Sequence, residues 1–172
     1  MTRELFFDTD CISAFLWIKD TNILQALYGG YIVLPEPVFQ ELSNPRVPHL
    51  RKRVEDLIEK KVASLKYIEP GTKEYHLYRE LQKGKKAIGK GEASGIALAV
   101  IYDGILASNN YKDVAPFIKM YNLKHVDTGM ILKEAYEKNI ITEKEGNDIW
   151  CKMLQRNRKL PSATFSDYLH NL

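Results

Sequence analysis

The sequence predicts an α/β fold: a three-layer α/β/α sandwich with a mainly parallel central sheet, extended by C-terminal helices. The first observation is that short apolar segments alternate with segments of helical periodicity, as in strands joined by covering helices. The second is that the strand candidates are continuously apolar, which is typical of strands buried on both faces. The third is the composition: 172 residues with 45% hydrophobic and 27% charged side chains suit a globular chain with a sizeable core.

The first half of the chain is divided by polar and glycine-rich turns. The apolar run Leu5-Phe6-Phe7 predicts a buried strand that ends in a polar turn. We expect Asp10 to act as the N-cap of the helix that follows, and Gly29-Gly30 to end the next helix. The elements expected here are strands at 5–7, 31–34 and 62–68, and helices at 11–18, 23–28, 38–42, 46–61 and 74–82.

The second half begins with a helix built largely from small and aliphatic residues, over 92–102. Thr142-Glu143-Lys144-Glu145 has the pattern of a capping box and predicts the start of a long helix. The other elements expected here are strands at 104–107 and 123–126, helices at 114–121 and 128–138, and a helical turn after residue 161. We therefore divide the chain into an α/β domain over 1–127 and a helical extension over 128–172 that packs on the same domain.

Charge, cysteine content and hydrophobicity indicate in which cellular compartment the protein works and which kinds of partner it can have. With 25 Lys+Arg against 22 Asp+Glu, the net charge of +3 permits contact with nucleic acid but does not require it. Cys11 and Cys151 form no CxxC pair, which favours a reducing compartment. Because no stretch approaches the ~20 apolar residues of a membrane span, we expect a cytoplasmic protein with no membrane partner.

Asp8 is the first candidate for chemistry, because it directly follows the first predicted strand. Ligands of open α/β sheets bind at the carboxyl ends of the strands. The alternative is that Asp8, Thr9 and Asp10 only cap the next helix, which suits Asp10 better than Asp8. A carboxylate at the end of Leu5-Phe6-Phe7 must lose water, and such an acid usually needs a cation beside it.

Other candidates lie at helix starts and at a second strand end. Glu92 opens a helix that is almost entirely apolar from Ala93 onward, so it is either a buried-site acid or a first-turn glutamate favoured by the helix dipole. Glu41 borders the buried side of its helix but by itself reads as a solvated residue. Ser108-Asn109-Asn110-Tyr111-Lys112-Asp113 follows the fourth predicted strand, either as a plain polar turn or as part of a cleft shared with the acids.

Together these segments resemble the ordered acidic motifs of PIN-domain ribonucleases, a family that includes VapC-type toxins. The resemblance spans residues 5 to about 127, and its most specific part is the helix that begins at Gly91 and Glu92. The segments that carry it are Phe6-Phe7-Asp8-Thr9-Asp10, the Glu41 helix, Gly91-Glu92-Ala93-Ser94-Gly95-Ile96-Ala97-Leu98-Ala99 and Leu106-Ala107-Ser108-Asn109-Asn110.

The resemblance implies a Mg²⁺- or Mn²⁺-dependent endoribonuclease with RNA as substrate. Asp8, Glu41 and Glu92 match the family's first three acids, whereas Asn109-Asn110 replaces the commoner Asp pair and Asp113 would supply the fourth acid. On this basis Asp8, Glu92 and Asp113 would hold the metal ion and Glu41 would be a ligand or support one. Ser108 and Asn109 would orient water or a ligand oxygen, and Thr9 would help fix Asp8. Carboxylate oxygens are the ligands that both ions prefer.

A basic segment precedes Glu92. Four lysines lie within residues 83–91, and we expect three of them, Lys85, Lys86 and Lys90, to bind substrate phosphates. The alternative is a loop that is merely solvated.

Two other functions remain open at this point. In a haloacid-dehalogenase-like phosphatase, Asp8 would be the nucleophile and Asp10 the acid/base, although Glu92 would then have no role. In a catalytically degenerate PIN-like domain, the Asn109-Asn110 change would leave a module that binds RNA or a protein. The C-terminal helices carry apolar faces that either pack on the sheet or form a homodimer or antitoxin surface.

Overall fold

The computed structural model describes residues 3–171, and within this range a five-stranded parallel sheet lies between two layers of helices. The order of the strands across the sheet is β3-β2-β1-β4-β5, and each is parallel to its neighbours. This arrangement confirms the predicted fold class. The strands are β1 (Leu5–Phe7), β2 (Ile32–Pro35), β3 (Ala63–Lys66), β4 (Ile105–Ala107) and β5 (Lys124–Val126).

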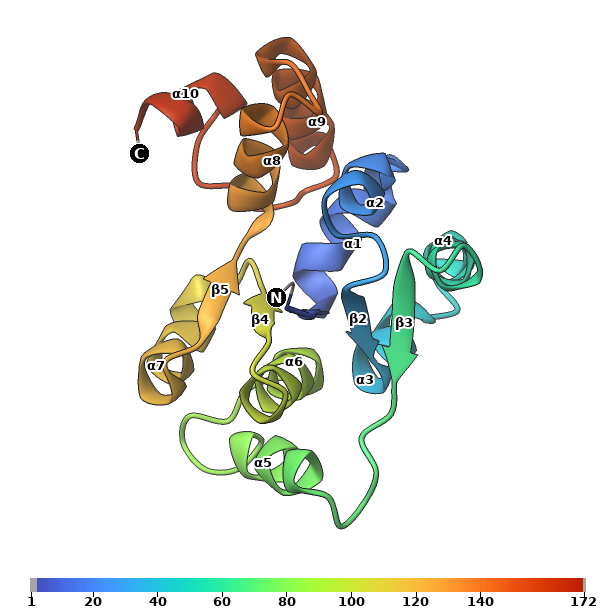
Figure 1. The fold of residues 1–172 in the computed structure, drawn as a ribbon, viewed down its shortest axis with the longest axis vertical. Helices are drawn as coiled ribbons and strands as arrows, with labels where there is room; N and C mark the ends of the chain where they lie inside the picture. Colours follow the sequence, from blue (N-terminus) through green and yellow to red (C-terminus); the bar gives the residue numbers. More distant parts are fainter. Residues whose placement is uncertain (1–2, 172) are drawn as a thin grey trace.

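Helices connect the strands and continue beyond the last one. The helices are α1 (Thr9–Ile18), α2 (Asn22–Tyr28), α3 (Glu36–Leu42), α4 (Pro48–Glu59), α5 (Lys73–Leu81), α6 (Lys90–Ile101), α7 (Tyr111–Tyr121), α8 (Thr128–Glu137), α9 (Glu143–Gln155) and α10 (Phe165–His170). Figure 1 shows α5 and α6 together on one side of the sheet, with α8, α9 and α10 at the far end, where α8 and α9 lie beside α1 and α2 and α10 packs on α8 and α9.

Side chains of the central strands alternate between two hydrophobic cores. Phe6 points to the core that contains α6, whereas Leu5 and Phe7 point to the core that contains α1. Successive side chains of a strand face opposite sides of the sheet, so a strand covered on both faces must be apolar at every position. This explains why β1 reads as an unbroken apolar run.

The C-terminal helices complete the larger of these cores. Trp150, Met153 and Phe165 are fully buried and belong to the same cluster as Phe15 and Leu24 of α1 and α2. The rings of Trp150 and Phe165 are also 5.7 Å apart, centre to centre, and tilted at 43°, a contact that adds to the stabilisation from their burial. Helices α8, α9 and α10 therefore contribute to the core that contains α1 and α2, while the division of the chain into a domain over 1–127 and an extension over 128–172 stays a prediction.

The first helix begins earlier than expected, and its N-cap is Asp8 rather than Asp10. Asp8 is still extended (φ −79°, ψ 170°), and its side chain accepts a hydrogen bond of 2.8 Å from the backbone N–H of Cys11. Asp10 already lies in the first helical turn and is exposed. The helix therefore starts as soon as the strand ends, since the carboxylate of Asp8 satisfies a free N–H of the first turn.

Candidate active site

The site forms where the chain reverses its direction of travel across the sheet. From β1 the chain moves outward to β2 and β3, then returns to the other side of β1 as β4. Such a switch point, at the carboxyl ends of the strands, is where open α/β sheets bind ligands. Phe7 pairs with Ala107, and the Asp8 N–H donates to the Ala107 carbonyl at 2.9 Å, so Asp8 and Ser108 leave adjacent strands side by side.

Asp8 is held in an environment that opposes its charge. The side chain is 1% exposed, and burial raises the pKa of its carboxyl to about 7, despite the Cys11 N–H and the nearby Ser108 hydroxyl, which act in the opposite direction. Oδ1 accepts the capping hydrogen bond, but Oδ2 is buried and has no hydrogen-bond partner within residues 3–171. An unpaired buried oxygen of this kind requires a proton or a cation.

Glu41 reaches the same site from α3 through a close approach to α6. Its carboxylate accepts hydrogen bonds from the Thr9 hydroxyl and, at 3.2 Å, from the Gly91 N–H. A Cβ on Gly91 would lie 2.7 Å from Thr9 Oγ1 and 2.9 Å from Glu41 Oε2, closer than such atoms can pack. Glycine at residue 91 is therefore what allows the backbone of α6 to meet both side chains.

Glu92 and Asp113 are connected by the side-chain amide of Asn110, a residue for which the sequence indicated no individual role. The Asn110 side-chain nitrogen lies 3.3 Å from Glu92 Oε1 and 2.6 Å from Asp113 Oδ2, and it donates to both. Asn109 is used differently: its Oδ1 accepts from the Thr128 N–H at 2.9 Å. Of the two asparagines, Asn110 is therefore the one that orients acids.

A small cavity of about 170 Å³ lies between the ends of β1, α3 and α6. Four of the residues expected in the site line it, namely Asp8, Thr9, Glu41 and Glu92. A neighbouring cavity of about 340 Å³ shares Glu92 and is also bordered by Asn109. The first cavity is completed by Asp10, Ser13, Gly91 and Arg158.

Some expected site residues lie outside these cavities. Asp113 is exposed and contacts the site only through Asn110, and it lines neither cavity. Lys85, Lys86 and Lys90 are exposed at the loop before α6 and at its first residue, and they also line neither cavity. Their roles in binding metal or phosphate stay predictions.

Arg158 is a site residue that could not be predicted from the sequence. It follows α9, and its guanidinium donates at 3.3 Å to both Asp10 Oδ1 and Ser13 Oγ in the first turns of α1. It borders both cavities, so the segment after α9 contributes a cation beside the acids. Neither periodicity nor spacing could reveal this contact, since it joins residues almost 150 positions apart.

The residues present partly fit a divalent cation. The buried, unpartnered Oδ2 of Asp8 and the Glu92 carboxylate at the same cavity are oxygen donors of the kind that Mg²⁺ and Mn²⁺ select. Within residues 3–171, however, no three His, Cys, Asp or Glu side chains are arranged as a complete ligand group. A small ligand set is compatible with Mg²⁺, which usually keeps several of its waters.

A family model identifies the family, and a solved structure shares the fold. Residues 4–172 match the family model described as DUF3368, a PIN domain, so the chain belongs to this PIN-domain family. PIN domains are generally nucleases that use divalent metal ions. A solved structure of VapBC-1 from nontypeable Haemophilus influenzae has the same fold: 16% identity, a TM-score of 0.50, and coverage of 72% of this chain and 97% of the other. No curated protein matches the sequence.

A separate observation concerns membranes. Among the helices within residues 3–171, none has both the length and the hydrophobicity needed for a membrane span.

Proposed function

We propose that this protein is a metal-dependent endoribonuclease that hydrolyses RNA phosphodiester bonds at the cavity between β1, α3 and α6. The observation that carries the proposal is the convergence of Asp8, Glu41 and Glu92 on one cavity, with Asp8 Oδ2 buried and unpaired. Membership of the PIN family supports the nuclease class and favours it over a phosphatase that would use Asp8 as a nucleophile.

In this proposal Asp8 and Glu92 bind one Mg²⁺ or Mn²⁺ ion. When bound, such an ion lowers the pKa of a water and stabilises the charge that develops on a phosphate. Glu41 is held by Thr9 and by the Gly91 N–H, which positions it to orient water or a ligand oxygen.

Groups around these acids would support binding and orientation. The Asn110 amide holds the Glu92 carboxylate in place relative to that of Asp113. Asp113 would therefore influence the metal ion through Asn110 or through a bridging water, and not as a direct ligand. Ser108 lies beside Asp8 and limits how far burial raises the pKa of its carboxyl. Arg158, half-buried at the mouth, offers a positive charge to an incoming phosphate.

We extend the proposal to the biological setting as well. The likeness to VapBC-1 supports a role as the toxin of a toxin–antitoxin pair in the cytoplasm, with an antitoxin protein as partner. A homodimer is the second assembly we propose. Copurification and light scattering of the expressed protein test both assemblies, and a monomer with no bound protein would contradict them.

Cleavage of a panel of single-stranded and structured RNAs tests the activity directly. Wild type is incubated with Mn²⁺, Mg²⁺ or EDTA beside Asp8→Asn and Glu92→Gln, and each variant is checked for folding. Asparagine remains a good N-cap, so Asp8→Asn removes the charge without removing the cap. We expect each variant to lose about 1,000-fold in rate, equivalent to about 4 kcal/mol.

Asp127→Asn is the matched control for this experiment. Asp127 also follows a strand and caps a helix, accepting from the Met130 N–H at 2.8 Å, but it lines neither cavity of the site. Cleavage at the wild-type rate by this variant, together with loss in the other two, would support the acidic site. Cleavage that persists in EDTA, or in folded Asp8→Asn, would contradict it.

One observation favours a second candidate, a catalytically degenerate domain that binds RNA or a protein. The Oδ1 of Asn109 is engaged with the Thr128 N–H, and its buried Nδ2 has no partner within residues 3–171. The residue at this position therefore supplies structure rather than a ligand for a cation. RNA binding without cleavage, equal in wild type and Asp8→Asn, would favour this candidate.

A further inference from the structure

A second hollow lies at the other end of α1 from the acids. This groove, with a volume of about 380 Å³, runs between the end of α1 and the surface of α4. Half of the eight residues that line it are cationic, namely Lys19, Lys52, Arg53 and Lys60, and the lining also includes His49 and Asp56. Because α1 has ten residues, it separates the groove from Asp8 by about 15 Å.

The positive charge of the groove is only partly neutralised. Asp56 is the acid that lines it, within the described part of the chain, and this side chain pairs with Lys52 at 3.4 Å in an exposed contact. Burial, and then the positive charge of Arg156, lower the pKa of the Arg53 guanidinium. Arg53 donates to the Trp17 carbonyl and the Arg156 guanidinium lies 5.9 Å from the centre of the Trp17 ring, so both guanidinium groups lie at this end of α1 and add to its positive potential.

The segment after α9 connects the groove to the acidic cavity. Arg158 pairs with Asp10 in the first turn of α1, and the Arg156 guanidinium lies 5.9 Å from the ring centre of Trp17 in its last turn. Residues 156–158 therefore follow α1 along its length. We call the resulting row of cations the basic strip; it consists of Arg158, Arg156, Arg53, Lys19, Lys52 and Lys60.

Two aromatic rings lie beside these cations: His49, which lines the groove, and Trp17, which contacts His49 but does not line the groove. Trp17 is partly buried and meets the exposed His49 at 4.9 Å between ring centres, with the rings at 67°. Surfaces that bind single-stranded nucleic acid combine cations that follow the backbone with rings on which bases stack. An acidic peptide would use the cations but not the rings.

We infer that the basic strip binds the single-stranded RNA that flanks the cleaved bond, leading it from the acidic cavity along α1 to the groove. The inference rests on the proposed ribonuclease function, because the cavity fixes where one phosphate lies and the strip continues from that point. It specifies a substrate that extends well beyond the cleaved phosphate, and an affinity that depends strongly on salt.

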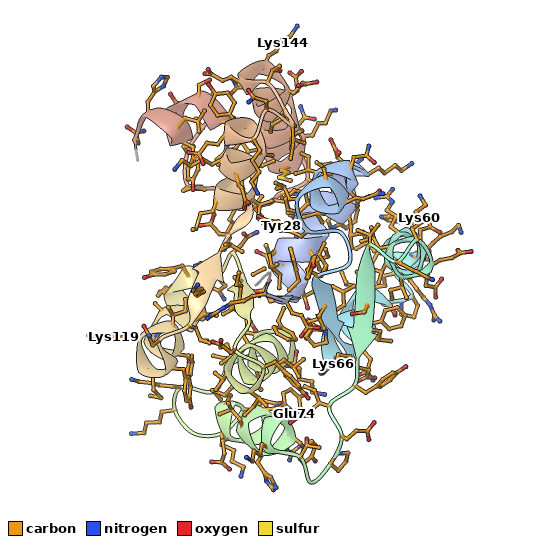
Figure 2. All side chains as sticks on the ribbon, viewed as in Figure 1. Tyr28, Lys60, Lys66, Glu74, Lys119 and Lys144 are labelled. Atoms are coloured by element: carbon orange, nitrogen blue, oxygen red, sulfur yellow. The ribbon has the colours of Figure 1, made fainter. Side chains whose placement is uncertain are left out.

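A triple variant of Lys19→Gln, Lys52→Gln and Lys60→Gln tests this inference. These lysines are exposed, so their replacement changes charge with little effect on packing, as Figure 2 illustrates for Lys60. Arg53 is left intact because it donates hydrogen bonds to the Leu16 and Trp17 carbonyls and so joins α4 to α1. The control triple Lys73→Gln, Lys119→Gln and Lys144→Gln has the same net charge; Figure 2 shows Lys119 on α7 and Lys144 on α9, away from α4.

Binding is measured with EDTA present, so that no RNA is cut, using a single-stranded RNA of about 16 nucleotides and one of about 4. We expect the groove variant to bind the long RNA at least about tenfold more weakly and its salt dependence to flatten by about 2 in the slope of log K against log salt. The affinity for the short RNA should fall less, so the ratio of the affinity for the long RNA to that for the short RNA is lower in the groove variant than in wild type. The control triple should behave like wild type.

The outcomes separate this inference from the proposed function. Equal affinity and equal salt slope in the two triple variants overturn the inference, even if wild type cleaves RNA with metal. The inference is also overturned if the groove variant loses binding to a polyglutamate peptide while its affinity for RNA is unchanged. That result would show that the groove binds an acidic protein and not RNA. Groove-dependent RNA binding by a wild type that never cleaves, with any metal, supports the strip as an RNA surface while the proposed catalysis fails.

Discussion

Two aspartates of this protein perform the same local task in different surroundings. Asp8 follows β1 and caps α1, and Asp127 follows β5 and caps α8; each accepts a 2.8 Å hydrogen bond from the third N–H of its helix. Asp127 is half-buried at the outer strand, whereas Asp8 is 1% exposed at the centre of the sheet. Helix capping accounts for the hydrogen bond to Oδ1 of each aspartate, but it does not explain why Oδ2 of Asp8 is buried without a hydrogen-bond partner.

This difference shows how a functional acid can be distinguished from a structural one. A helix cap contributes about 1 kcal/mol wherever it lies, and an exposed cap achieves this without loss of solvation. Burying the second oxygen opposes ionisation and destabilises the charged, metal-free protein. The arrangement at Asp8 is therefore costly unless a cation binds there, and the same cost is absent at Asp127.

The largest expected effect concerns the pH dependence of stability without metal. Folding raises the pKa of Asp8 from 3.8 to about 7, so the folded state retains a proton that the unfolded chain releases between these values. The contribution of Asp8 is therefore most favourable below pH 4 and is lost as pH rises toward 7. From pH 4 to pH 8, the free energy of unfolding of Asp8→Asn should rise relative to wild type by about 4 kcal/mol.

Urea unfolding in EDTA at several pH values measures this effect. Asp127→Asn is the control, because Asp127 caps its helix in the same way but is only half-buried. Added Mn²⁺ should stabilise wild type at pH 8 and leave Asp8→Asn unchanged. Parallel pH profiles for wild type and Asp8→Asn would remove the distinction between the two aspartates.

The next effect comes from the close approach at residue 91. Gly91→Ala places a Cβ against Thr9 and Glu41, and the resulting shift should destabilise the fold by about 1–3 kcal/mol and lower cleavage about 100-fold. Gly30→Ala is a useful contrast, because its Cβ would meet nothing within 4 Å although its φ of +84° is strained. Rates for the two folded variants separate geometric disruption of the site from general backbone strain. Comparable cleavage losses in both would argue against a specific role for Gly91.

A smaller effect is expected at Asn110, which links Glu92 to Asp113. Asn110→Ala frees both carboxylates and should lower metal-dependent cleavage about tenfold, as supporting groups of metal sites commonly do. Asp113→Asn should lower the cleavage rate by less than tenfold if Asp113 acts only through Asn110. A loss at Asp113 as large as that at Asp8 would make Asp113 a direct ligand instead.

The smallest effect defines the baseline for the comparison. Asp127→Ala removes a cap from an outer helix and should lower the free energy of unfolding by about 1 kcal/mol, while leaving cleavage at the wild-type rate. Thermal unfolding and the RNA panel measure the two quantities on one sample. A cleavage loss of tenfold or more would place Asp127 in the site.

The sequence allowed most of the fold to be predicted because β1 and α6 carry unambiguous patterns. A continuous apolar strand and an almost uniformly apolar helix can only be buried elements, and their order predicts a parallel sheet. The start of α1 was wrong by two residues, since Asp8 and Asp10 are both good caps and only the end of the strand decides between them. Sequence also cannot show which of the adjacent Asn109 and Asn110 contacts the acids: the Asn110 amide donates to Glu92, whereas the Asn109 side chain accepts from the Thr128 N–H. The role expected of Asn109 in orienting water or a ligand oxygen stays a prediction.

By itself, then, the sequence determined the class of the fold and the acids that follow β1 and open α6, because hydrophobic periodicity and residue type are local properties. The family followed from the resemblance of whole motifs to those of PIN domains. Tertiary structure alone decided which oxygen of Asp8 is buried without a hydrogen-bond partner, that Gly91 lets α6 approach Glu41, and that Arg158 pairs with Asp10. These features depend on distances between segments far apart in the chain. Burial, which raises the pKa of Asp8, is likewise set by everything that packs around β1 and not by the residues beside it.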